Sequence, residues 1–305
     1  MSKKLIVRIA NGLGNQLFLY SSAYAISKKI NKKLEIDDES GFISETRKIK
    51  YELDNFNITS EITSKKFKFN TPFKKVLRKT YKKFDRLGSN KKFLLEDKNK
   101  KSFINYSQKY FNRQYQDVVF MEGYFQSEKY FSDYQNEIRL ELSFKNHIIQ
   151  NNLEIQKDLL NTNSVLLHIR NHVFSETAQK KNKLNNLEQS NIYTKKTIEH
   201  CKKAINFFKE KLVDPKFFIF SNDFSLINQT FVGREFKLIN NNKNNNPIDD
   251  FYLMTLCKHF IISPSTFSWW AAWLCKNKYK ICIKPPKDLL MSNNLDIYPN
   301  EWISI

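Results

Sequence analysis

Small hydroxyl side chains lead into an aromatic helix near the C-terminal end of the chain. The loop runs from Ser263 to Ser268, and Ser265, Thr266 and Phe267 stand at the expected helix start. Free backbone N–H groups and the helix dipole make such a start suited to binding an anion, for example a phosphate. Ser and Thr are also ordinary N-caps of buried helices. On spacing alone, an anion site and a plain capped helix are both open.

A second chemical pattern lies at the end of an expected strand, residues 165–170. His168 and Arg170 alternate with apolar residues and therefore share one face of that strand. An Arg at the carboxyl end of a strand suits a phosphate or carboxylate contact, while a lone His is most often hydrogen-bonded core. Asp223 follows the next clear strand, residues 216–220. Its polar group would lie at the ligand-binding edge of the sheet.

A glycine turn follows the first expected strand, near the N-terminus. Gly12 and Gly14 are two of only six glycines in the chain, and Asn15 and Gln16 follow them before the next helix. A strand, a glycine turn and a helix allow a ligand to approach the backbone closely. A nicotinamide-dinucleotide site would want a third glycine where Leu17 stands. A strand–turn–helix unit without any ligand fits the residues better than that site.

The alternation of strands and helices predicts an α/β chain in two halves. Expected strands cover residues 5–9, 33–36, 118–120, 165–170, 216–220, 236–239, 259–262 and 280–283. The main expected helices cover residues 17–26, 73–87, 193–211 and 251–258, the last capped by Asp249 or Asp250. A polar segment at 146–163 is the best boundary. It predicts an N-terminal domain at 1–155, with a basic insertion at about 61–104, and a C-terminal domain at 156–305.

The charge balance calls for an anionic partner, because the formal net charge is +20. Within the basic insertion, Phe73, Val76, Leu77, Tyr81 and Phe84 fall close to helical spacing, with lysines on the opposite face. Such a helix suits the surface of an anionic membrane. A packed surface helix with a solvated lysine face is the plainer interpretation. No recognised reading motif accompanies the charge, so a nucleic-acid partner is not expected.

The cysteines and the apolar runs indicate a reducing compartment. Cys201, Cys257, Cys275 and Cys282 are scattered without C-x-x-C spacing, so neither disulfides nor a zinc site are expected. The N-terminus lacks the apolar stretch of a signal peptide, and no apolar run is long enough to span a membrane. The sequence therefore predicts a cytoplasmic protein.

Four blocks of sequence, in order, resemble signatures of a known family. They are GLGNQLF at 12–18, GYFQSEKYF at 123–131, FIFSND at 218–223 and STFSWWAAWL at 265–274. Together they resemble the bacterial α-1,2-fucosyltransferases of glycosyltransferase family 11, over nearly the whole chain. The resemblance implies an α/β, GT-B-like fold with two Rossmann-like halves facing a central cleft. The acceptor half would come first and the nucleotide-sugar half second.

The same resemblance implies an activity. It is the inverting transfer of L-fucose from GDP-fucose to a galactose-type hydroxyl, in α-1,2 linkage, without an essential metal or other cofactor. The acceptor would be an oligosaccharide or a lipid-linked glycan, such as a precursor of a surface polysaccharide or O-antigen. The basic balance fits such an acceptor at the inner face of the plasma membrane, with peripheral contact to anionic lipid.

The resemblance also assigns roles to residues. Arg170 and Asn15 are the catalytic candidates, Arg170 as a group that stabilises the leaving GDP. The candidates for donor binding are His168, Asn171, Asp223, Asp249, Ser265, Thr266, Phe267, Gly12, Gly14 and Gln16. A transition state of this kind needs a good leaving group more than a strong base. The base is therefore unassigned, with Glu122, Asp37 and His172 as candidates.

One block departs from the family pattern. The family usually shows H-x-R-R-x-D before an aromatic residue, where this chain has HIRNHVF at 168–174. Asn171 and Val173 thus replace the second arginine and the acid. Losing one of two charge-assisted donors removes stabilisation of the leaving group unless another cation substitutes. The departure motivates two alternatives: the same scaffold with another nucleotide sugar, or a non-catalytic glycan-binding relative.

Overall fold

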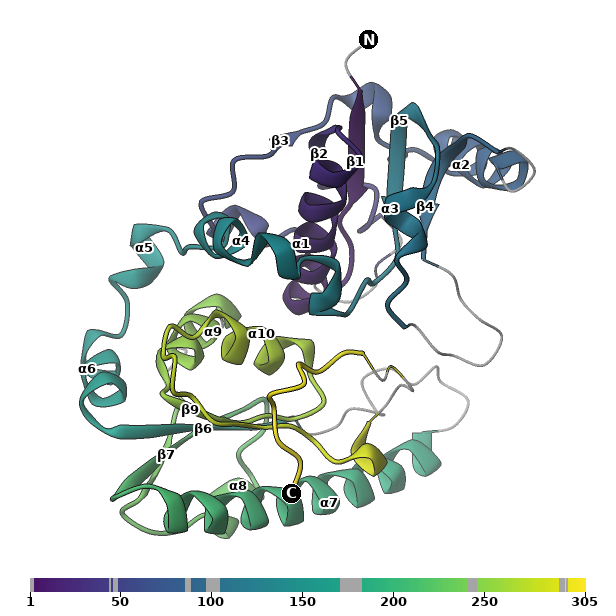
Figure 1. Cartoon of the computed structure of the whole chain (residues 1–305). Helices are drawn as coiled ribbons and strands as arrows, with labels where there is room; N and C mark the ends of the chain where they lie inside the picture. Colours follow the sequence, from purple (N-terminus) through teal and green to yellow (C-terminus); the bar gives the residue numbers. More distant parts are fainter. Residues whose placement is uncertain are drawn as a thin grey trace. The chain divides into compact units, whose positions relative to one another are not determined.

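The chain folds into two compact units, each of them α/β (Figure 1). The computed structural model describes residues 3–43, 45, 49–85, 89–96, 105–170, 183–240, 246–290, 294 and 296–305. The N-terminal unit comprises Met1–Lys145 and Ser292–Pro299, and the C-terminal unit comprises Asn146–Met291 and Asn300–Ile305. The division thus falls ten residues before the boundary expected after residue 155 (155 − 145).

The N-terminal unit is built on a five-stranded sheet with the order β3-β2-β1-β5-β4. Its strands are β1 (Lys4–Arg8), β2 (Lys33–Asp37), β3 (Glu61–Ile62), β4 (Lys91–Leu95) and β5 (Tyr115–Glu122). All neighbouring pairs are parallel; Leu5, for example, lies opposite Leu34 on one side and Val119 on the other. Such a sheet is covered on both faces, which is why β1 is a nearly unbroken apolar run.

Several helices surround this sheet. They are α1 (Leu13–Lys29), α2 (Pro72–Asp85), α3 (Lys109–Asn112) and α4 (Gln135–Glu141), with the 3₁₀ turns η1 (Leu53–Asn55), η2 (Lys65–Phe67), η3 (Glu128–Tyr130) and η4 (Ser132–Tyr134). The stretch at 61–104 is not a simple insertion, because β3 and β4 within it form the two edges of the sheet. The sequence pattern does not predict β4, because Lys91 and Lys92 leave an apolar segment of only Phe93–Leu95.

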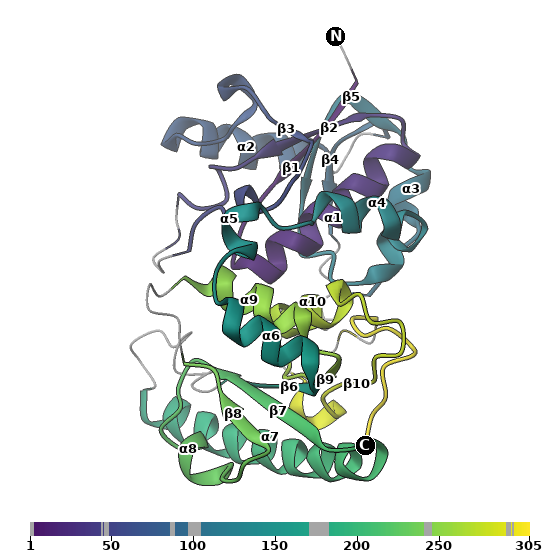
Figure 2. The same ribbon diagram turned by 90° about the vertical axis from the view of Figure 1, so that its left-hand side faces the viewer.

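The C-terminal unit has a second parallel sheet, with the order β10-β9-β6-β7-β8. Its strands are β6 (Asn163–Ile169), β7 (Pro215–Ser221), β8 (Phe236–Leu238), β9 (His259–Ile261) and β10 (Cys282–Ile283). Its helices are α5 (Asn146–Ile149), α6 (Leu153–Asn161), α7 (Lys183–Lys211), α8 (Ile227–Thr230), α9 (Pro247–Leu256) and α10 (Thr266–Leu274), with the 3₁₀ turn η5 (Lys287–Leu289). Helix α7 lies on one face of the sheet and α9 and α10 on the other (Figures 1 and 2).

One detail adds to the sequence prediction and one corrects it. The division falls at the start of the segment 146–163 expected at the boundary, and α5 and α6 within that segment pack against α9 in the C-terminal unit. Helix α9 begins at Pro247 with Asn246 at the N-cap, so the predicted cap at Asp249 or Asp250 is wrong. Both aspartates lie in the first turn instead, where their charges suit the helix dipole.

The cysteines and the helices add two further facts. All four cysteines are buried free thiols. Within the described ranges, no helix combines the length and apolarity that crossing a bilayer requires.

Candidate functional site

The hydroxyl loop before α10 is held in shape by its own side chains. Ser265 is the N-cap, and its Oγ accepts a hydrogen bond from the Phe267 N–H at 3.3 Å. The Oγ of Ser268 donates to the carbonyl oxygens of Ser263 and Ser265 at 3.4 and 3.3 Å. The expectation of a capped helix is therefore confirmed. The cap uses one of the free N–H groups of the first turn, and the anion-site interpretation depends on the neighbours of the loop.

Helix α10 is anchored by a cluster of tryptophans. Trp269 lies with its ring centroid 5.0 Å from that of Trp270, 6.4 Å from Trp273 and 5.4 Å from Trp302. Trp269 and Trp270 are completely buried. Large rings packed in this way fix the axis and the rotation of the helix, and therefore fix the direction of its first N–H groups.

His168 on β6 meets the loop that follows β9. Its Nδ1 is 2.8 Å from the Oγ of Ser263, because β6 and β9 are neighbours in the parallel sheet. Burial, with a smaller effect from the charge of Arg170, lowers the pKa of His168 from 6.5 to about 3. The imidazole is therefore neutral near pH 7. A neutral, hydrogen-bonded ring can orient a ligand group but brings no charge to the site.

Arg170 supplies positive charge at the same edge of the sheet. It directly follows β6 and is exposed. Its charge lowers the pKa of His168 and opposes the rise that burial causes in the pKa of Tyr193. Arg170 thus lies close enough to both groups to act on them electrostatically. Asn171, a predicted donor contact, and His172, a predicted base, lie outside the described residues.

The two predicted aspartates have partners within the C-terminal unit. Asp223 shapes the turn after β7, where its Oδ1 accepts from the Ser225 N–H at 2.9 Å. Asp249 is buried in α9 and accepts a hydrogen bond from Asn151 Nδ2 at 3.1 Å. Phe251, also in α9, lies 4.9 Å from Phe267, ring to ring. The predicted contacts of Asp223 and Asp249 with the nucleotide stay predictions.

The glycine turn of the N-terminal unit leaves its backbone open. Asn11 has a φ of 65°, and Gly12 is the N-cap of α1. A Cβ added at Gly12 would meet no described atom within 4 Å, whereas Gly14 is buried inside α1. Gly12 is therefore not required by crowding within the protein. An open position of this kind fits close approach by a ligand.

Gln16 and Asn15 act differently in this turn. Gln16 is completely buried; its Nε2 donates to the carbonyl oxygens of Asn11 and Lys50, and its Oε1 accepts from the Glu52 N–H. It therefore braces the turn, and a sugar contact by Gln16 stays a prediction. Asn15 is only half-buried, and its Oδ1 accepts from Gln126 Nε2 at 2.6 Å. This bond joins the first and second sequence blocks.

A hollow of about 850 Å³ opens where β1, β4 and β5 end, which sequence reasoning missed. Its lining includes Arg8, Asn11, Arg78, Lys82, Glu122 and Tyr124. The signal available in the sequence was Gly123 after a strand, at the ligand edge of an α/β sheet. The hollow lies beside the open glycine turn and is polar enough for a hydrophilic ligand.

The predicted base candidates in this unit are engaged in the fold. Burial raises the pKa of Glu122, but hydrogen bonds from Arg78 and the charge of Lys82 outweigh it and keep the pKa low. Asp37 is buried, and its Oδ1 accepts from the N–H groups of Glu39 and Ser40. Both carboxylates hold structure together, and the assignment of a base stays open.

Comparison with known proteins finds a matching family and relatives over nearly the whole length of the chain. The model of the family "Glycosyl transferase family 11" matches residues 2–305. An alpha-1,2-colitosyltransferase of Escherichia coli is 30% identical, over 99% of this chain and 98% of its own. The O-antigen biosynthesis glycosyltransferase WbnK of Escherichia coli is 27% identical, over 97% and 99%.

Two solved structures share the fold at low sequence identity. NodZ alpha-1,6-fucosyltransferase soaked with GDP-fucose has a TM-score of 0.54 at 13% identity, covering 90% of this chain and 93% of its own. A mutant of Arabidopsis thaliana FUT1 in complex with GDP has a TM-score of 0.56 at 12% identity, covering 98% and 75%. The fold is therefore GT-B-like, as expected from the sequence blocks. With the family match over its full length, this chain belongs to glycosyltransferase family 11.

Proposed function

We propose that this glycosyltransferase moves L-fucose from GDP-fucose to a galactose-type hydroxyl, with inversion and in α-1,2 linkage. The observation that supports it most lies at the edge of the C-terminal sheet, where neutral His168 contacts Ser263 in the loop before the Ser265-capped start of α10, and Arg170 follows the same strand as His168. The names of two relatives, an alpha-1,2-colitosyltransferase and an O-antigen glycosyltransferase, support a precursor of a surface polysaccharide as acceptor.

In this mechanism the protein stabilises the leaving diphosphate. Negative charge grows on GDP as the glycosidic bond breaks, and Arg170 with the N–H groups at the start of α10 would receive it. Arg170 and the helix dipole are the positive groups in the proposal, and no metal or other cofactor has a part in it. Treatment with EDTA should then leave turnover unchanged.

The N-terminal unit would receive the acceptor. The hollow beside Asn11 and Tyr124 is open and polar, and the nearby Asn15 offers an amide for sugar hydroxyls. The acceptor in this proposal is an oligosaccharide or a lipid-linked glycan, and the lipid-linked form would place the reaction at the inner face of the plasma membrane.

A second donor is a specific alternative. The relative with 30% identity is named for colitose, which lacks the hydroxyl that fucose carries at carbon 3. Asn171 and Val173 also depart from the family's usual block, so this chain could use a related nucleotide sugar. Binding of GDP-fucose and GDP-colitose, followed by turnover with each, decides between the two donors.

The phosphate assignment is tested with Arg170→Ala and Ser265→Ala. Each should lower turnover of the accepted donor by about 10²-fold, as loss of one oxyanion donor typically does. Arg234→Ala is the matched control, since Arg234 is also exposed and lies in the same unit, between β7 and β8. Undiminished turnover in both test variants would show that the assignment is wrong. Donor binding without transfer to any glycan in a broad panel would instead indicate a non-catalytic relative.

A further inference from the structure

Helix α2 packs against its unit with its charged face. Arg78 and Lys82 both bind the buried carboxylate of Glu122 at the end of β5, Arg78 through Nε at 2.6 Å and through a second nitrogen. At the end of the helix, Asp85 accepts from the backbone N–H groups of Lys92 and Phe93. These bonds fix how α2 is rotated about its axis.

The opposite face of α2 is apolar and exposed. Phe73, Val76 and Phe84 expose 76%, 63% and 66% of their surface, and Thr80 between them is exposed as well. Residues three, seven and eleven positions after Phe73 lie on one side of an α-helix. These four residues form a ridge, which we call the α2 ridge. An amphipathic helix normally buries its apolar side, so α2 is inverted with respect to that rule.

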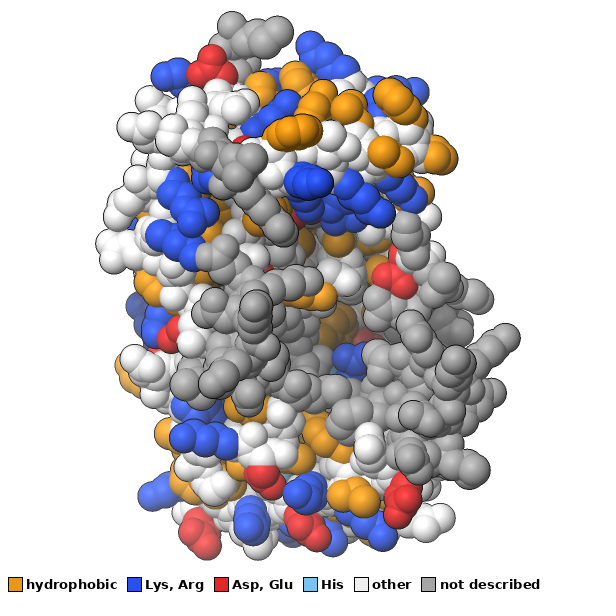
Figure 3. Space-filling model, turned by 90° about the vertical axis from the view of Figure 1, so that its right-hand side faces the viewer, with side chains coloured by type: hydrophobic (Ala, Val, Ile, Leu, Met, Phe, Trp, Pro, Cys, Tyr) orange, Lys and Arg blue, Asp and Glu red, His pale blue; other side chains and the backbone are white. Residues whose placement is uncertain are grey.

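Lysines border the α2 ridge. Lys79 and Lys83 are exposed beside it, Lys75 is partly exposed, and the sequence contains no acid between Ser64 and Phe84. Figure 3 shows hydrophobic and basic side chains next to each other over the upper part of the face on which α2 lies. Apolar contact and positive charge are therefore offered to the same partner.

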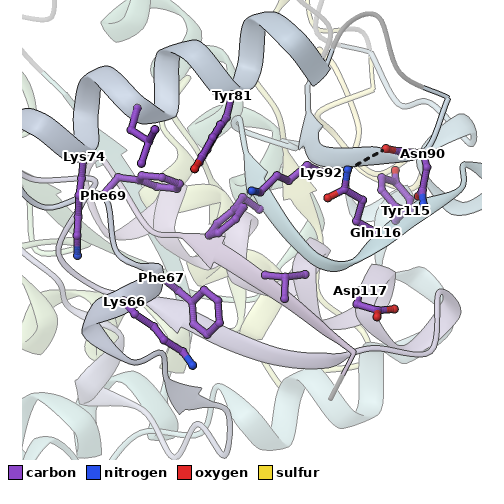
Figure 4. A pocket seen from close by; sticks show the side chains of 13 residues that line it. Lys66, Phe67, Phe69, Lys74, Tyr81, Asn90, Lys92, Tyr115, Gln116 and Asp117 are labelled. Carbon is purple, nitrogen blue, oxygen red and sulfur yellow. Dashed lines mark hydrogen bonds between the residues drawn. The ribbon is translucent and has the colours of Figure 1, made fainter. Parts of the chain in front are cut away.

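A groove of about 630 Å³ continues this surface on the sheet side of α2. Tyr81 and Phe69 lie in it, and Lys66, Lys74 and Lys92 stand around it (Figure 4). The Nζ of Lys92 lies 4.1 Å from the centre of the Tyr81 ring. Aromatic faces bordered by ammonium groups repeat the chemistry of the ridge.

We propose that the α2 ridge lies in the headgroup region of an anionic phospholipid bilayer. Phe73, Val76 and Phe84 would enter the apolar boundary, while the bordering lysines contact lipid phosphates, which is how interfacial helices bind. The charge complementarity selects this occupant, because Lys75, Lys79 and Lys83 follow one side of the ridge and no acidic side chain among the described residues 73–84 lies along it. The side chains of Phe73, Val76 and Phe84 are well exposed, and a deformable bilayer can follow their outline. The inference concerns membrane binding alone and stands whether or not the proposed donor is correct.

The test is flotation of the full chain with vesicles of phosphatidylcholine, with and without phosphatidylglycerol. The wild type should float with the anionic vesicles at low salt and be released at high salt. The triple variant Phe73→Glu, Val76→Glu, Phe84→Glu should lose roughly tenfold or more of this partitioning. The matched control replaces three exposed apolar residues of the C-terminal unit by Glu: Val213, Val232 and Tyr279, which are 85%, 74% and 88% exposed. It adds the same charge and should retain more binding than the ridge variant.

Circular dichroism checks that each variant is folded. We expect folded variants, because the replaced side chains are exposed and support no core. The proposal is overturned if the wild type stays in solution with anionic vesicles, or if both triple variants lose equal binding. Sedimentation velocity tests the alternative occupant of the α2 ridge, which is a second copy of the chain. A wild-type dimer that the ridge variant alone dissociates, without any flotation, would assign the ridge to a second copy of the chain and refute the lipid.

Discussion

Replacing His168 by Asn should make the C-terminal unit less sensitive to acid. In the native protein, burial lowers the pKa of His168 from 6.5 to about 3, so the ring stays neutral while it is folded. In the unfolded chain the ring titrates at about 6.5. Between these two pKa values the unfolded state binds a proton that the native state does not. The free energy of unfolding therefore falls as the pH falls below about 6.5.

The magnitude follows from linkage. Each pH unit between the two pKa values costs about 1.4 kcal/mol, so lowering the pH from 7 to 5 should remove about 2 kcal/mol through His168. His168→Asn lacks this titration but keeps a polar atom near the position of Nδ1, within reach of Ser263. The buried His200 and His259 also have lowered pKa values, but they are present in both proteins and cancel in the comparison.

The assay can be confined to the unit in question. All four tryptophans, Trp269, Trp270, Trp273 and Trp302, belong to the C-terminal unit. Tryptophan fluorescence during urea unfolding therefore reports on that unit. The free energy of unfolding of wild type and variant is measured at pH 7 and at pH 5. The wild type should lose about 2 kcal/mol more than the variant. Equal losses would refute the burial argument, whatever the stability of the variant at pH 7.

Three other substitutions test local geometry. Gly41→Ala would place a Cβ 1.7 Å from the carbonyl oxygen of Ile9, so it should cost about 3 kcal/mol, read as a lower melting temperature by circular dichroism. Gly12→Ala meets no described atom within 4 Å, and because Ala is a poorer N-cap than Gly it should cost at most about 1 kcal/mol. Turnover of the folded variant should fall if a substrate approaches this turn, and unchanged turnover would argue against such an approach. Tyr193→Phe removes a buried hydrogen bond of 3.0 Å to the Leu289 carbonyl and should destabilise the C-terminal unit by about 1 kcal/mol in tryptophan-detected urea unfolding.

Much of the architecture was predictable because local patterns and the tertiary fold agree. Strands such as β6 and β7 are apolar runs bounded by polar residues, and both were found close to their observed ends. The His168–Ser263 contact was within reach of the same reasoning, since adjacent parallel strands end at one edge of a sheet. The contacts of Gln16 were not predictable from the sequence. Its three backbone partners come from residues 11, 50 and 52, which only the folded chain brings together.

For helix α2, the sequence pattern predicts the helix but not its rotation about its own axis. The spacing of Phe73, Val76 and Phe84 correctly indicated an amphipathic helix. Two interpretations were open, a helix at an anionic membrane surface and a helix that packs its apolar side inward and leaves a solvated lysine face. The rotation is set by Glu122, which lies 44 residues after Arg78 and binds it together with Lys82. A buried carboxylate needs cationic partners, and that requirement is not visible in the helix itself.

The tryptophan cluster links the capping of the loop before α10 to the catalytic role that we propose for it. Stabilising a leaving diphosphate is effective only if the donors already point at it, because reorienting them during the reaction would cost part of the gain. Here the orientation is fixed during folding, by rings buried behind the helix and by the hydroxyls of Ser265 and Ser268 within the loop. The same bonds that make Ser265 an ordinary N-cap thus keep the remaining N–H groups in fixed directions, as the proposed phosphate site requires. The capped helix and the anion site are therefore compatible interpretations of the same loop. A measurement of ligand binding is what tests the anion site.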